Sequence, residues 1–328
     1  MDIKAIQEYL GHSWAEVKDT IVASLKSDIE LLNATNASIL SHSGKQMRPM
    51  LSLLTAKACT CGEVSGSTVS YAAASELLHN ATLLHDDVAD ESVQRRGAPT
   101  VMSLMGPSVS VLVGDYWLVK AVDLVLASDD ENASVVMKLF AGTLSHLAEG
   151  EMLQLQKAQR GDTTEGDYLR IVYNKTASLF ESACVSAAYS VGACPEFIEA
   201  ARKYAVSLGI AFQIQDDILD YAGTNVVGKP LGADILEQKI TMPLLGALAN
   251  VPEEKALQVR KMISDIPSHP EYRDEIVSFV KDNGGLDYAV SRLKDYVQEA
   301  VTSLSVFPES QARSYLVELA YYTADRAL

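Results

Sequence analysis

Residues 83–90 read LLHDDVAD, and a second copy of the same pattern, IQDDILD, occupies residues 214–220. Each stretch places a DDxxD motif at the end of a run that is otherwise apolar and helix-forming. The six aspartates are Asp86, Asp87, Asp90, Asp216, Asp217 and Asp220. On a helix, the first and last aspartates of a motif lie on one face about 6 Å apart along the axis, so their charges repel. Oxygen-only ligands favour a hard cation such as Mg²⁺, which retains water and is shared with substrate phosphate oxygens.

Cationic residues support a phosphate-binding role for these motifs, although a single DDxxD would also fit a solvated helix end or a cap. Lys45 and Arg48 lie just before a predicted helix that has Pro49 near its first turn. The N-terminus of a helix is a ready anion site. Arg95 and Arg96 follow the first motif in a turn-rich loop, and guanidinium groups bind phosphate bidentately.

A polar stripe also leads along the predicted helix to the first motif. His79, Thr82, Asp86 and Asp90 are spaced by three or four residues, which places them on one face of that helix. His79 fits either a core histidine or a member of the site, and the sequence leaves both readings open.

Polar residues also surround the second motif. Lys175 and Thr176 lie within a small-residue helix, where the lysine either snorkels to solvent or faces a polar cavity. Gln213 precedes Asp216 by three residues. A glycine-rich loop at residues 223–232 contains Lys229, and Lys239 follows it.

Composition limits the class of protein. With 48% hydrophobic and 21% charged residues, the chain of 328 residues has material for a large core. Its net charge of −16 argues against nonspecific nucleic-acid binding. We find no signal-peptide pattern and no apolar run long enough for a transmembrane segment. The spacing of the four cysteines does not suit zinc, which favours free thiols in a reducing cytoplasm.

Helical periodicity dominates the chain, and we predict an all-α fold with a single domain over residues 1–328. Ser13 begins a capping box, and the apolar spacing that follows predicts a helix to about Asn33. Strand-like alternation does not accumulate anywhere, and no low-complexity linker divides the chain. The similarity of the two motifs alone suggests two facing halves of one cavity.

Taken in order, these motifs resemble those of the trans-isoprenyl diphosphate synthases, specifically the polyprenyl (long-chain) diphosphate synthases. The resemblance covers about residues 40–245 and rests on the two DDxxD motifs together with GKxxRP at residues 44–49, RRG at 95–97, Lys175-Thr176 and GKP at 228–230. It implies the isoprenoid synthase fold, a bundle of long antiparallel helices around a deep central cavity. It also implies a homodimer.

The resemblance assigns roles to these residues in a magnesium-dependent condensation of isopentenyl diphosphate with an allylic diphosphate. The two aspartate motifs would face each other and hold three Mg²⁺ on the allylic diphosphate. Arg96, Lys175, Lys229 and Lys239 would contact that diphosphate, and Lys45, Arg48, His79 and Arg95 would bind isopentenyl diphosphate. Thr176 and Gln213 complete the predicted substrate-binding set, and Asp86, Asp87, Asp90, Lys175, Asp216 and Lys229 the predicted catalytic set.

The residues just before the first motif predict a long product. The growing tail should run back along this helix, where Ala81 and Thr82 are small. Short-chain members of the family resemble one another in having an aromatic floor there. We therefore expect a product beyond the geranylgeranyl stage, suited to a quinone side chain and made from farnesyl or geranylgeranyl diphosphate. The floor of the cavity could still come from another helix, and the candidate residues for it are Tyr116, Trp117, Met137 and Leu144.

Other functions remain as alternatives. A short-chain synthase would share every motif, and a noncatalytic partner subunit usually loses motif carboxylates, all of which are present here. A terpene cyclase typically has a different second metal motif and no second diphosphate site. Departures from the family pattern are Ser43 in place of a second glycine, Gln46-Met47 in the same loop, and a C-terminus reduced to the basic residue Arg326.

Overall fold

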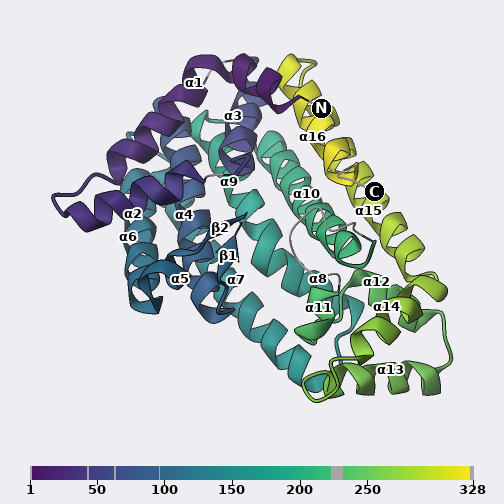
Figure 1. Cartoon of the computed structure of the whole chain (residues 1–328). Helices are drawn as coiled ribbons and strands as arrows, with labels where there is room; N and C mark the ends of the chain where they lie inside the picture. Colours follow the sequence, from purple (N-terminus) through teal and green to yellow (C-terminus); the bar gives the residue numbers. More distant parts are fainter. Residues whose placement is uncertain (1, 43, 63, 96, 223–231, 326–328) are drawn as a thin grey trace. The chain divides into compact units, whose positions relative to one another are not determined.

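The computed structural model describes residues 2–42, 44–62, 64–95, 97–222 and 232–325, and helices make up most of them (Figure 1). The all-α prediction is therefore confirmed. Within this part of the chain the only strands are β1 (Gln94–Arg95) and β2 (Ala98–Pro99), an antiparallel pair. None of the helices described is long and apolar enough to span a membrane.

The chain forms two compact units. The first comprises Met1–Ala141, Glu181–Arg202 and Leu304–Leu316, and the second comprises Gly142–Phe180, Lys203–Ser303 and Val317–Leu328. The helices within the first unit are α1 (Ile3–Ser24), α2 (Glu30–Ser41), α3 (Met47–Thr60), α4 (Gly66–Ala89), α5 (Val101–Met105) and α6 (Pro107–Leu126). The single-domain assignment stays a prediction.

Helix α4 is the centre of the first unit. It packs against α1, α3 and α6, and its residues 71–78 are all buried. Ser65 caps it in a reciprocal capping box with Thr68, and its last turn carries the first aspartate motif. The core of the unit therefore fixes the position of this motif.

The N-terminal helix is placed earlier in the chain than predicted, because α1 begins at Ile3 with Asp2 as its N-cap, so Ser13 lies inside the helix instead of at its start. A kink at Gly11, with φ of 51°, separates the first turns of α1 from the segment beginning near Ser13. The helix then ends at Ser24 instead of near Asn33. The Asn33 side chain accepts a hydrogen bond from the Ser27 N–H and donates one to the Ser27 carbonyl, which stabilises a turn there. Apolar periodicity carries no signal of this local competition.

The second unit contains the later helices. Four helices have residues in both units, namely α7 (Ala133–Arg160), α9 (Ser178–Ser190), α10 (Pro195–Ala222) and α16 (Gln311–Ala324). The others are α8 (Glu165–Val172), α11 (Ala233–Leu236), α12 (Met242–Ala249), α13 (Glu253–Asp265), α14 (Tyr272–Asp282) and α15 (Gly285–Ser303). This unit also contains the π-helical turn Tyr173–Ala177, called the π turn below, and a 3₁₀ turn at Leu304–Val306 belongs to the first unit.

Helix α12 is the centre of this unit. Residues 242–248 are all buried, and α12 packs against α15. Gly246 permits that contact, because a Cβ there would lie 2.6 Å from the Cβ of Tyr288. A capping box begins α8, where Thr164 and Asp167 each cap the backbone of the other.

Candidate active site

The first aspartate motif ends α4 and is divided between exposed and buried carboxylates. Asp86 is half-buried, Asp90 is the exposed C-cap, and Asp87 is buried. The carboxylate of Asp87 forms an ion pair with Arg95, whose Nε lies 2.8 Å from Oδ1. Because Arg95 lies in β1, the short hairpin after α4 brings a predicted substrate-binding cation onto the first motif.

The other predicted residues of the first unit lie on α3 and α4. Lys45 precedes α3, Arg48 lies in its first turn, and Gln46 between them has a left-handed φ of 50°. His79 and Thr82 are half-buried on α4. Ala81 is buried against α6, where its carbonyl lies 3.2 Å from the position that a Cβ of Gly114 would take. Arg96 lies outside the described residues, as do Lys229 and residues 223–231, so their roles stay predictions.

In the second unit, Lys175 and Thr176 lie in the π turn, which the sequence did not predict. Turns of this type are rare and concentrate at functional sites. A Cβ on Gly150 of α7 would lie 2.8 Å from the Cγ of Lys175, and a Cβ on Gly209 of α10 would lie 2.5 Å from the Cα of Ala177. The two glycines therefore let the π turn approach both helices. Isolated glycines within helical patterns were the available signal.

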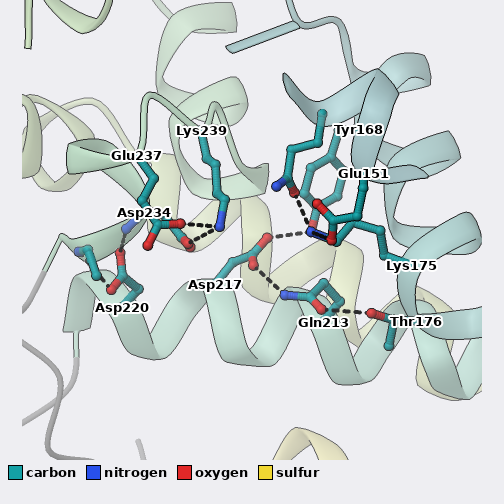
Figure 2. A network of polar contacts seen from close by, with 12 residues as sticks. Glu151, Tyr168, Lys175, Thr176, Gln213, Asp217, Asp220, Asp234, Glu237 and Lys239 are labelled. Carbon is teal, nitrogen blue, oxygen red and sulfur yellow. Dashed lines mark hydrogen bonds and ion pairs between the residues drawn. The ribbon is translucent and has the colours of Figure 1, made fainter. Parts of the chain in front are cut away.

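A chain of hydrogen bonds connects the π turn to the second aspartate motif on α10 (Figure 2). Thr176 Oγ1 donates to Gln213 Oε1 at 3.0 Å, and Gln213 Nε2 donates to Asp217 Oδ1 at 3.0 Å. The Tyr168 hydroxyl of α8 donates to Asp217 Oδ2 at 2.5 Å. Burial, followed by the charge of Asp234, raises the pKa of Asp217 well above its usual value. Burial and the charge of Asp217 likewise raise the pKa of Tyr168.

The predicted cations Lys175 and Lys239 each lie beside carboxylates (Figure 2). Lys175 Nζ forms an ion pair with Glu151 and donates to Gln154 Oε1 at 3.1 Å. Lys239 forms an ion pair with Glu237 and lies 3.9 Å from Asp234 Oδ1. Both positive charges are therefore held in place by acidic partners.

The third aspartate of the second motif caps a short helix. Asp220 Oδ1 accepts the N–H of Ala233 at 3.0 Å, and Oδ2 accepts the N–H of Asp234 at 3.2 Å. Through these bonds Asp220 fixes the start of α11 and the position of Asp234. This contact was not predicted from the sequence.

One pocket of the second unit is lined by several of the side chains described above, namely Lys175, Thr176, Gln213, Asp217, Asp234 and Lys239. Among the described residues no three acidic, histidine or cysteine side chains are arranged to hold a metal by themselves. Mg²⁺ usually takes one or two carboxylates and completes its shell with water and phosphate oxygens. The half-buried or exposed Asp86, Asp90, Asp216 and Asp220 fit that requirement.

We expect Gly209→Ala to lower kcat/KM by about 10- to 100-fold, because a displacement of about 1 Å at a catalytic group can cost that much. The added methyl would meet Ala177 and push the π turn, with Lys175, away from α10. Steady-state kinetics on the purified variant measure this effect.

Gly142→Ala is the matched control for Gly209→Ala. It is also a glycine-to-alanine change within a helix, but its Cβ would meet nothing within 4 Å. Equal activity of the two folded variants would show that the close approach at Gly209 has no part in catalysis.

Comparisons with known proteins all point to one family. Residues 29–280 match the family model for polyprenyl synthetase. The chain is 36% identical to the octaprenyl diphosphate synthase of Haemophilus influenzae over 327 residues, which cover 99% of this chain and 98% of that protein. The crystal structure of a decaprenyl diphosphate synthase from Rhodobacter capsulatus has a TM-score of 0.91 at 33% identity, with all of both chains covered. A polyprenyl synthase from Caulobacter crescentus, complexed with calcium and isoprenyl diphosphate, has a TM-score of 0.89 at 31% identity, covering 100% of this chain and 98% of that one.

Proposed function

The chain belongs to the polyprenyl synthetase family of prenyltransferases, and we propose that it condenses isopentenyl diphosphate head-to-tail with an allylic diphosphate to give a long-chain all-trans polyprenyl diphosphate. The observation that carries this proposal is the pocket of the second unit. It gathers three lysines, Lys157, Lys175 and Lys239, beside Asp217 of the second aspartate motif, and such a set of charges suits a metal-bound diphosphate.

Ionisation of the allylic substrate is the step that these residues serve. Cleavage of the allylic C–O bond leaves the diphosphate with additional negative charge, and fixed cations stabilise that charge more in the transition state than in the ground state. Lys175 and Lys239 supply fixed positive charge from the pocket wall. Arg96 and Lys229 are proposed for the same diphosphate.

Bound Mg²⁺ would add neutralising charge on the leaving diphosphate. Its proposed ligands are the exposed or half-buried Asp86, Asp90, Asp216 and Asp220. Three ions per site, as the family resemblance implies, would suit two motifs that serve one reaction. The calcium and isoprenyl diphosphate bound by the Caulobacter relative support a divalent cation as cofactor. For the buried Asp87 and Asp217, a metal-binding role stays a prediction.

The second substrate, isopentenyl diphosphate, would bind through Lys45, Arg48, His79 and Arg95. The position of Arg48 in the first turn of α3 supports this, because a helix N-terminus adds its own positive potential. The isopentenyl double bond then attacks the allylic carbocation, and loss of a proton restores an alkene. Water must be excluded while the carbocation exists.

A long product is supported by the small side chains of Ala81 and Thr82 on α4, which precede the first motif. The octaprenyl and decaprenyl synthases among the relatives agree with this reading. We also propose that the enzyme works in the cytoplasm, where its four free cysteines would stay reduced.

We further propose a homodimer, supported by an apolar stripe on α6. Leu112, Val119 and Leu126 are spaced by seven residues and are 67%, 55% and 62% exposed. Exposed apolar side chains that recur along one face of a helix are typical of protein contacts. Light scattering of the purified chain measures its mass in solution, and a monomer at micromolar concentration would refute this assembly.

The activity is tested by incubating purified protein with Mg²⁺, isopentenyl diphosphate and farnesyl diphosphate, with and without EDTA. Mass analysis of the dephosphorylated products should give a metal-dependent ladder that ends in a long polyprenol. A ladder that stops at the farnesyl or geranylgeranyl stage would identify a short-chain synthase. No elongation with any allylic primer would favour a noncatalytic partner subunit.

A further inference from the structure

Asp217 differs from the other aspartates of its motif in its surroundings. Its side chain is buried at 1% exposure, whereas Asp216 and Asp220 are half-buried. Both of its carboxylate oxygens accept hydrogen bonds from side chains, one from Gln213 and one from Tyr168, whereas those of Asp220 accept backbone N–H groups. A buried carboxylate needs such donors, because its desolvation is costly when it has none.

The donor from α8 is the one that the sequence did not reveal. Tyr168 is 4% exposed, and its hydroxyl reaches Asp217 from 49 positions away in the chain. Tyrosine hydroxyls that are buried usually find a partner, and here the partner belongs to the second aspartate motif. The contact thus joins α8 to α10 directly at the site.

The same hydrogen bonds include the π turn. From Tyr168 they pass through Asp217 and Gln213 to Thr176. Thr176 is the chain neighbour of Lys175, and Asp217 is the chain neighbour of Asp216. A displacement at either end of this network therefore changes the spacing between the cation and the aspartate motif.

We propose that Tyr168 is a positioning residue, which holds Asp217 so that Lys175 and the second aspartate motif stay correctly spaced for a diphosphate. This inference rests on the proposed function. It gives Asp217 the role of a hydrogen-bond acceptor that organises the site, and it leaves cation binding in this motif to Asp216 and Asp220. Preorganisation of this kind matters because charged groups must already point at the leaving group when the bond breaks.

Tyr168→Phe tests the proposal, since it removes only the hydroxyl. Isothermal titration with inorganic diphosphate in saturating Mg²⁺ measures binding directly, without turnover. We expect the dissociation constant to rise about tenfold, and the Mg²⁺ concentration for half-maximal activity to rise with it. The KM for isopentenyl diphosphate should change less than about twofold, because its proposed residues belong to the first unit.

Tyr71→Phe is the matched control. The Tyr71 hydroxyl is also buried and also donates to an aspartate, Asp130 Oδ2 at 2.9 Å, but it belongs to the first unit on α4. The control should lower the thermal midpoint of unfolding about as much as Tyr168→Phe and leave diphosphate binding unchanged. Equal diphosphate affinity in the two variants would overturn the proposal.

A second variant keeps the test valid if Tyr168→Phe folds poorly. Thr176→Val breaks the other end of the network, and a double mutant shows whether the two ends act as one unit. If the two ends act as one unit, the dissociation constant of the double mutant should rise by less than the product of the two single increases. An increase equal to that product would show independent effects and would contradict the network. Failure of the proposed function would appear already in the wild type, as absent diphosphate binding and absent elongation.

Discussion

Replacement of Asp86 or of Asp216 by Asn is expected to lower kcat by about 10³-fold or more, the scale seen when a group that stabilises developing phosphate charge is removed. Asparagine keeps the size of the side chain and removes its negative charge, so it binds a hard cation poorly. Single-turnover rates with farnesyl and isopentenyl diphosphates measure the loss. Treatment of the wild type with EDTA should abolish activity, and added Mg²⁺ should restore it.

Asp295→Asn is the control for this prediction. Asp295 lies on α15 in the second unit, its side chain is 63% exposed, and it forms an ion pair with Arg292. Exposed pairs of this kind contribute little, so activity and stability should hardly change. If Asp86→Asn or Asp216→Asn kept activity within about tenfold of the control, the proposed metal-binding role would be wrong for that motif.

The aspartate motifs and the fold class could be predicted from the sequence. The two aspartate motifs could be found because hard cations and phosphate call for clustered carboxylates, whereas Lys175 and Lys239 were assigned through the family resemblance. The all-α fold could be found because apolar periodicity is strong and strand-like alternation is scarce. The structure then brings Lys175, Thr176, Gln213, Asp217 and Lys239 to one pocket, as a shared site requires.

Features set by tertiary contact could not be predicted. The π turn depends on the close approach of Gly150 and Gly209, and an isolated glycine in a helical pattern marks a close contact without showing which segment makes it. Tyr168 reads as an ordinary core residue of an amphipathic helix, because its partner is distant in the chain. The partner of Arg95 was also missed, since the hairpin that brings it to Asp87 consists of only two residues per strand.

Buried and exposed aspartates within one motif could not be told apart from spacing alone. The DDxxD pattern places the middle aspartate about 100° around the helix from the first. Whether that direction meets solvent or protein depends on neighbouring elements. Here it meets Arg95 in one motif, and Gln213 and Tyr168 in the other, so Asp87 and Asp217 are the buried members.

Ala81→Phe is expected to shorten the product to a few isoprene units beyond the primer, with the rate of the first condensation little changed. Ala81 lies on α4, five positions before Asp86, which corresponds to about 7.5 Å along the helix axis. A tail that grows back along α4 would meet the new ring soon after the first additions. The measurement is the mass distribution of dephosphorylated products.

Because Ala81 packs tightly against α6, this experiment must also measure the stability of each variant. Insertion of a large side chain into a packed core commonly costs about 1–3 kcal/mol of stability, so the thermal midpoint must be measured as well. Thr82→Phe places the ring at a half-buried position four residues before Asp86, on the same face of the helix, where it can be accommodated more easily. Ala81→Ser keeps the side chain small and should leave the product length unchanged. If both phenylalanine variants fold and still make the full-length product, the tail does not run along α4, and its floor must be sought on another helix.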